Sequence, residues 1–203
     1  MPLVGPRSRR FVPLAFVLAA TSLAACRDKP QEVSTPVASA ASKPVVPPLT
    51  YELPGTWPKV AESQISAKRA TFKVPRAGAD TEDAELTVYF FGTGSQGDAD
   101  KNFSEWFSQF DGNAAATAAR TTLDSPAGKV DTVEVAGTYK VALGPTVGPK
   151  KRAAMQMVKD NWRLYGAVVR TKDRGNWFFK LTGPNETVQS AKGSLEASLQ
   201  AAR

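Results

Sequence analysis

The sequence contains no histidine and only one cysteine among 203 residues. Without histidine the chain cannot build a Ser-His-Asp or Cys-His catalytic group, nor a histidine-based zinc or copper site. With one cysteine it cannot form a disulfide within the chain. Carboxylate pairs and a serine with a lysine remain as enzymatic options. We expect a protein that is not an enzyme, with no catalytic residue, no cofactor and no metal site.

Three compositional zones make up the first 25 residues. A basic stretch with Arg7, Arg9 and Arg10 precedes an apolar stretch from 11 to 20, and small residues then end at Ala25. Such a segment is typical of a secretory signal peptide, because a helix of about 15 residues reaches only about 22 Å against about 30 Å of bilayer hydrocarbon. The alternatives are an uncleaved anchor and an ordinary secretory peptide.

The run Leu23-Ala24-Ala25-Cys26 ends this segment. It resembles the lipobox of bacterial lipoproteins. The resemblance implies that Cys26 carries the lipid, that cleavage occurs before it, and that the chain is held to a membrane on the extracytoplasmic side. In Gram-negative lipoproteins generally, aspartate directly after the cysteine favours the inner membrane. Arg27 stands there in this chain, which favours the outer membrane over the inner one.

A proline-rich stretch follows, with five prolines and no aromatic residue between 27 and 48. It cannot bury enough apolar surface to offset the entropy of ordering it, so we expect a disordered tether over 26–48. A proline-rich recognition segment is the alternative. The expected organisation is therefore a signal peptide over 1–25, the lipidated tether over 26–48, and a single globular domain over 49–203.

The whole chain has 26 basic and 19 acidic residues, and three of the arginines lie in the expected signal peptide. The remaining basicity is modest and does not identify a partner. In an exported protein nucleic acid is not expected, whereas an envelope protein or a glycan is compatible with the charge.

Alternation of apolar and polar residues predicts strands in the domain. Ala70, Phe72 and Val74 alternate with polar neighbours, which predicts a half-buried strand over 69–74. Both faces are apolar over 85–91, as in a strand covered on both sides. Three more strands are predicted at 132–141, 163–170 and 176–182. The last two flank a polar turn and are predicted to form a hairpin.

Helical spacing appears twice in the domain. The first helix is predicted to start at Asp98, the expected N-cap, and to end near Gly112. Its aromatic stripe is typical of a core face rather than a ligand platform, and consists of Phe103, Trp106, Phe107 and Phe110. The second helix is predicted over 184–201 and begins with proline in its first turn.

This order of elements predicts an α+β domain with a mainly antiparallel twisted sheet flanked by helices. Several segments also resemble a group of uncharacterised bacterial lipoproteins: 52–57, 70–72, 84–88, 106–110, 137–139 and 177–184. The resemblance implies a Mog1/PsbP/DcrB-like α/β/α sandwich. That fold hosts unrelated roles, so the resemblance implies no activity.

Four carboxylates precede the strand at 85–91: Asp80, Glu82, Asp83 and Glu85. A glycosidase would need two carboxylates about 5 to 9.5 Å apart across a sugar cleft. Nothing in this stretch indicates such a cleft, and the spacing differs from that of an EF-hand calcium loop. A solvated acidic turn is the favoured interpretation.

Residues 144–161 contain two Gly-Pro pairs and are interpreted as a long connection between two strands. Its basic triplet, Lys150, Lys151 and Arg152, is the candidate partner-binding loop. A solvated insertion with a short helical turn is the favoured interpretation of the stretch as a whole.

Three functions are compatible with these features. The favoured one is a membrane-tethered, non-enzymatic envelope lipoprotein that acts as a binding or scaffold module. The alternative is a lipoprotein that binds a small ligand or a glycan, with Trp57, Trp162 and Trp177 as stacking residues if they are exposed. The third is a hydrolase that uses carboxylates or a serine with a lysine.

Overall fold

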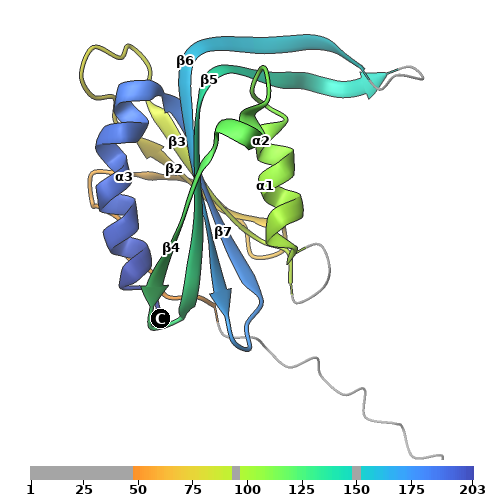
Figure 1. Ribbon diagram of the computed structural model, residues 1–203. Coiled ribbons are helices and arrows are strands. Elements are labelled where there is room, and N and C mark those ends of the chain that lie inside the picture. Colours follow the sequence, from red (N-terminus) through yellow and green to blue (C-terminus); the bar gives the residue numbers. More distant parts are fainter. Residues whose placement is uncertain (1–47, 93–96, 148–151) are drawn as a thin grey trace, which may run out of the picture. The chain divides into compact units, whose positions relative to one another are not determined.

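An antiparallel sheet of seven strands dominates the part of the chain that the structure describes (Figure 1). The computed structural model describes residues 48–92, 97–147 and 152–203, without the side chains of 142–147 and 152–155. The strands, in chain order, are β1 (Lys59–Glu62), β2 (Lys68–Val74), β3 (Ala84–Phe90), β4 (Ala119–Ser125), β5 (Gly128–Val147), β6 (Arg152–Thr171) and β7 (Asn176–Pro184). The helices are α1 (Ala99–Phe107), α2 (Ala114–Thr117) and α3 (Asn185–Gln200).

The expected fold class, a sheet flanked by helices in a Mog1/PsbP-like sandwich, is wrong. The structure is dominated by its sheet: β5 and β6 have 20 residues each, whereas α3 has 16, α1 has 9 and α2 has 4. The physical reason is that residues 144–147 and 152–161, expected in a loop, continue strands β5 and β6. The disordered tether expected over 26–48 lies outside the described residues, except for Pro48.

Strand β7 lies at the centre of the sheet, in the order β1-β2-β3-β7-β6-β5-β4. Trp177, Phe179 and Leu181 point to the face covered by α3, and Phe178 points to the face covered by α1. Both faces of β7 are therefore apolar, as expected for a strand buried on two sides. The predicted hairpin is confirmed, because residues 162–170 of β6 pair antiparallel with residues 176–184 of β7.

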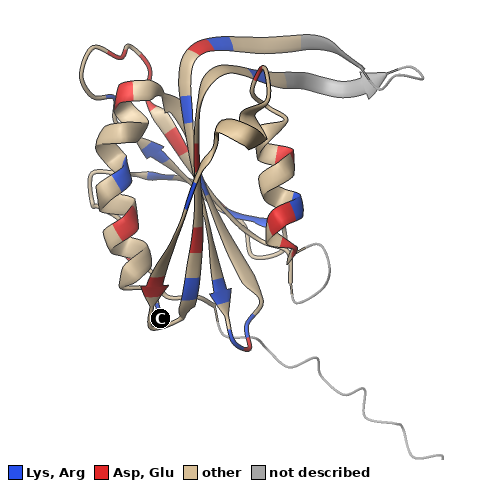
Figure 2. Cartoon of the chain, viewed as in Figure 1, with Lys and Arg blue, Asp and Glu red and all other residues tan. Residues whose placement is uncertain are grey.

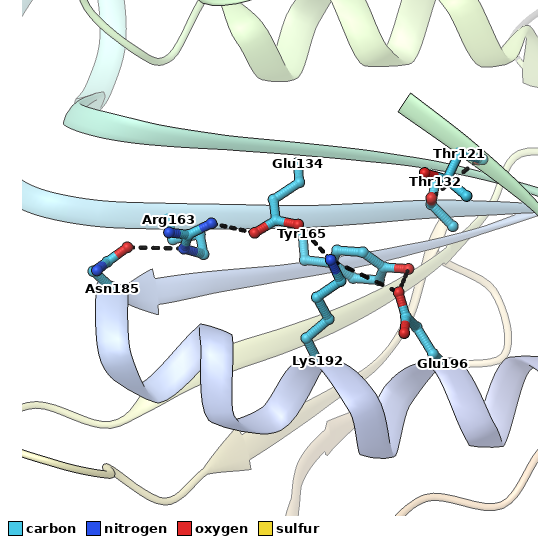
Figure 3. Close-up of polar contacts among 8 residues, drawn as sticks. All are labelled: Thr121, Thr132, Glu134, Arg163, Tyr165, Asn185, Lys192 and Glu196. Atoms are coloured by element: carbon cyan, nitrogen blue, oxygen red, sulfur yellow. Dashed lines mark hydrogen bonds and ion pairs between the residues drawn. The ribbon is translucent and has the colours of Figure 1, made fainter. Parts of the chain in front are cut away.

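Helix α3 is fixed to the sheet by a polar network as well as by its apolar face (Figure 3). Glu134 on β5 pairs with Arg163 on β6 and accepts a 2.6 Å hydrogen bond from Lys192 on α3. Arg163 Nε also donates to Asn185 Oδ1 at 2.8 Å. Burial by itself raises the pKa of Glu134, but Lys192 and Arg163 together hold it below its ordinary value. The carboxylate is therefore charged and links three elements.

Helix α1 begins as predicted, since the Asp98 side chain accepts a hydrogen bond from the Lys101 backbone N–H. The predicted core stripe is confirmed as well: its four aromatic residues are buried against the sheet. The helix ends at Phe107, earlier than predicted, because Phe110 forms a β-bridge with Tyr139 and draws the following backbone to β5.

The ends of β5 and β6 form a two-stranded arm, defined here as residues 140–147 and 152–159, which pairs with no other strand of the described chain. The pairing register shifts between Gly137 and Tyr139, so the ladder contains a bulge at this point. Opposite this shift, Asn161 has a φ of 56°, and the ribbon bends (Figure 1). The C-terminus lies at the other end of the sheet from the arm (Figure 1).

Charges of both signs are interspersed along the strands and helices (Figure 2). Within the described residues, no helix is long and apolar enough to span a membrane. Charge alone therefore does not mark a functional surface on the domain.

Candidate binding cleft

A cleft of about 470 Å³ lies between the N-terminal segment of the domain and the β1, β2, β3 and β7 side of the sheet. Its volume falls within the range of about 300–1,000 Å³ that is usual for small-molecule sites. The residues that give it chemical character are Leu49, Tyr51, Glu62, Arg69, Phe90 and Trp177.

The aromatic wall of the cleft results from strand register. Phe90 on β3 lies directly opposite Trp177 on β7, and their rings stack with centroids 4.7 Å apart and planes 24° apart. Such cross-strand aromatic pairs stabilise a sheet and hold both rings in place. Tyr51 contacts Phe179 edge to face at 5.0 Å, which fixes the opposite side of the cleft.

Arg69 enters the cleft because β2 contains a bulge. Lys68 pairs with Tyr89 and Ala70 pairs with Val88, so Arg69 is an extra residue with no partner on β3. A bulge of this kind redirects the side chain at the irregularity. The guanidinium carbon lies 5.4 Å from the centre of the Phe90 ring, and Nη1 donates to the backbone oxygen of Gln64.

Two donors in the cleft wall have no acceptor among the residues that the structure describes: Arg69 Nε and Trp177 Nε1. Both nitrogens are shielded from bulk solvent. A buried donor without a partner costs about 1–3 kcal/mol. The cleft therefore combines an apolar wall with unmet hydrogen-bond donors on two of the side chains that line it.

The remaining polar groups at the cleft are already engaged or neutral. The Glu62 carboxylate forms a 3.1 Å ion pair with Lys59. Burial, reinforced by the charge of Glu62, raises the pKa of Tyr51 to about 12. The Tyr51 hydroxyl is consequently protonated at neutral pH, and Arg69 is the cation that lines the cleft.

The three tryptophans proposed as stacking residues do not form one platform. Trp57 and Trp177 are buried in the cluster on the α3 side of the sheet. Trp162 packs on the α1 side, stacked on Tyr139 at 5.3 Å. Trp177 alone among them lines this cleft.

The acidic turn has structural partners. Asp80 accepts hydrogen bonds from the Thr187 backbone N–H at 2.7 Å and hydroxyl at 2.8 Å, near the start of α3. Glu82 pairs with Lys159, Asp83 pairs with Lys73, and Glu85 accepts from Thr87. In the described part of the chain, no group of three or more His, Cys, Asp or Glu side chains could hold a metal ion.

Of the remaining predicted site residues, Arg152 alone lies in the described part of the chain. The lipobox residues Leu23, Ala24 and Ala25, the lipid-attachment residue Cys26 and the basic residues Lys150 and Lys151 lie outside the described residues. Arg152 opens β6, where its backbone pairs with Val147 at the end of the arm, and its side chain is not described.

Lys180 is a second group of chemical interest, on the α1 face of β7. Its ammonium donates a 2.6 Å hydrogen bond to Gln109 Oε1 and lies 5.8 Å from the centre of the Tyr139 ring. Burial lowers the pKa of Lys180 to about 8, against the opposing effect of Glu105 and Glu85. Within the described chain its partner is an amide and not a serine, so the contacts do not form a serine-lysine pair.

The titration of Lys180 predicts how stability changes with pH. Below pH 8 the amine is protonated in both the folded and the unfolded chain; between about 8 and 10.5 only the unfolded chain keeps the proton. The free energy of unfolding should therefore rise with pH across this window, by up to about 1.4 kcal/mol per pH unit. Urea unfolding of the wild type at pH 7 to 9.5 measures the rise.

Two variants at the same position serve as controls. Lys180→Met has no charge and Lys180→Arg keeps its charge throughout, so neither should show the rise. Because tyrosine titration is common to all three proteins, differences between them isolate Lys180. An equal rise in Lys180→Met would assign the titration to another group.

Sequence patterns missed the cleft for a physical reason. Arg69 reads as an ordinary polar position of a strand, and only the bulge in the β2–β3 pairing moves it to the cleft. Phe90 and Trp177 meet only because β3 pairs with β7, which follows three other strands along the chain. No protein-family model matches the chain, and no curated protein matches its sequence.

Proposed function

We propose that this chain is a membrane-tethered, non-enzymatic binding lipoprotein, and that the cleft beside Arg69, Phe90 and Trp177 binds a small molecule. The single observation that carries the binding role is the cleft itself, whose aromatic wall and unmet donors fit a ligand with an apolar body and a polar end. Between a scaffold and a small-ligand binder, this geometry favours the second.

A binding role, as opposed to catalysis, is supported by the contacts of the carboxylates and of the buried lysine. The acidic turn supplies contacts to α3, β2 and β6 instead of facing a common cavity. The chain has no histidine to serve as a general base near neutral pH. Lys180, the buried amine, donates to an amide.

The proposed location rests on the sequence Leu23-Ala24-Ala25-Cys26. Acyl chains on Cys26 would hold the domain on the extracytoplasmic side of a membrane, with the outer membrane favoured by Arg27. Several acyl chains on one residue anchor a protein stably, whereas one chain binds only reversibly. Envelope proteins or glycans are further partners that such a location permits.

Binding can be tested with the mature chain carrying Cys26→Ser, which lacks the acyl chains and needs no detergent. The neutral apolar dye N-phenyl-1-naphthylamine should bind saturably, with an increase in its fluorescence, because the cleft wall is aromatic. Gln64→Trp places a large ring at the cleft rim and should weaken binding by about tenfold or more, equivalent to about 1.4 kcal/mol.

A matched control is available in the next residue. Ile65 is 99 % exposed and does not line the cleft, so Ile65→Trp should leave the affinity unchanged. Absence of saturable dye binding to the unblocked protein would refute the proposed function. Equal affinities of the two tryptophan variants would place the dye elsewhere.

A further inference from the structure

The buried polar atoms of the cleft wall that lack a partner in the described chain are both donors. Arg69 Nε and Trp177 Nε1 are both unmet donors, whereas the cleft's carboxylate, Glu62, is already paired with Lys59. A ligand that supplies acceptor oxygens would recover the cost of both donors, and a ligand that supplies only donors would recover neither.

The nature of Arg69 narrows the ligand further. A guanidinium presents its N–H groups in a flat fork that matches the oxygens of a planar anion. One arm of this fork, Nη1, is held by the Gln64 carbonyl, while Nε faces no acceptor in the described chain. The partner that completes this geometry is an oxyanion, not a neutral hydroxyl.

The aromatic wall defines the rest of the ligand. Phe90 and Tyr51 are partly exposed at the cleft, and Leu49 adds aliphatic surface. These side chains favour a flat or apolar body, which gains from being removed from water. We infer that the cleft selects a small amphipathic anion, with its carboxylate or sulfonate against Arg69 and Trp177 and its apolar body against Phe90 and Tyr51.

Access to the two donors requires a local change. Both nitrogens are shielded from solvent, so an incoming anion has to turn the Arg69 side chain out of its contact with Phe90. Arg69 can make this movement because it is partly exposed and stands at a bulge. Trp177 is buried and stacks on Phe90, the ring that Arg69 covers, so movement of Arg69 opens the side of the cleft on which Trp177 lies.

This inference rests on the proposed function, and two related dyes separate the outcomes. The dye 8-anilino-1-naphthalenesulfonate is N-phenyl-1-naphthylamine with an added sulfonate. Its affinity for the Cys26→Ser chain should exceed that of the neutral dye by about tenfold, as expected for one charge-assisted contact. Fluorescence titration of both dyes at constant ionic strength measures the ratio.

Three variants assign this preference to its residues. Arg69→Gln should reduce the ratio of the two affinities to about one, because only the sulfonate dye loses a charge-assisted contact. Arg69→Lys keeps the charge but loses the planar fork, and should give an intermediate ratio. Glu62→Gln removes a negative charge from the rim and should strengthen sulfonate binding.

The results can be told apart. If neither dye binds, the proposed function fails. If both bind equally and Arg69→Gln changes neither, the cleft binds apolar molecules and the anion inference is overturned. Because Arg69 is partly exposed, Arg69→Gln should fold; far-UV circular dichroism and an unchanged urea unfolding midpoint verify this.

Discussion

Gly166→Ala should destabilise the domain by about 3 kcal/mol, although it adds one methyl group. An added Cβ would lie 2.3 Å from Trp106 Cζ3 and 3.0 Å from Val133 Cγ2, and contacts this short force a rearrangement. Trp106 cannot retreat freely, because it packs against Phe103 and Phe178. Urea unfolding followed by far-UV circular dichroism measures the loss.

The control is the same substitution in a different environment. Gly193 lies in α3, and an added Cβ there would have no atom within 4 Å. Gly193→Ala should therefore stabilise the domain by about 0.5–1 kcal/mol through the better helix propensity of alanine. Opposite signs for two identical substitutions would exclude a general effect of losing glycine.

A double variant tests the cause at Gly166. Trp106→Leu removes the indole ring that the new methyl group would strike, so Gly166→Ala should cost less in that background than in the wild type. Equal costs in the two backgrounds would show that α1 does not press Trp106 onto β6.

Cys26→Ser should abolish acylation and release the domain from the membrane, an effect close to all or none. The thiol accepts the lipid in the proposed pathway, and the serine hydroxyl is a much weaker nucleophile. Each buried CH₂ of an acyl chain contributes about 0.8 kcal/mol to membrane binding, so loss of the chains removes the anchor. Metabolic labelling with a palmitate analogue, followed by cell fractionation, measures both effects.

The specificity of this result can be checked by moving the thiol two residues. Cys26→Ser combined with Asp28→Cys restores a cysteine that follows Arg27 instead of a small residue, and should remain unlabelled. Continued labelling of Cys26→Ser itself would overturn the lipoprotein assignment.

The spacing of apolar residues along the sequence correctly predicted strand β2 and helix α1. Ala70, Phe72 and Val74 alternate in sequence and are all buried on the same face of β2. The Asp98 cap and the aromatic stripe of α1 likewise depend on helical spacing alone. These features follow from the periods of the backbone, which the sequence displays directly.

The arm could not be predicted because its Gly-Pro pair is compatible with two backbone conformations, a turn and an irregular strand. Gly144 and Pro145 read as a turn, but they stand where the β5–β6 register shifts between Leu143 and Thr146. Proline is tolerated in a strand at such irregularities. Which conformation applies depends on whether the segment after residue 151 can pair with β5, and this is a property of the whole sheet.

The cleft was unpredictable for a related reason. Its walls come from the N-terminal segment and from strands that are adjacent only after the sheet has formed. Unmet donors are also a three-dimensional property, since nothing local distinguishes Trp177 from the other buried aromatic residues of β7.

The point at which the chain enters the domain has a mechanical consequence. Thr50 and Arg203 exchange two backbone hydrogen bonds, of 2.8 and 3.0 Å, so any tension on the proposed tether is borne first by this short pairing. Leu49 is buried beside it, and Pro48, Leu49 and Tyr51 all line the cleft. Detachment of this segment would remove one wall of the cleft. A pulling force on the tether would therefore lower the affinity of the cleft for the proposed ligand. A bound molecule would strengthen the attachment under load, and a stretched tether would release its ligand.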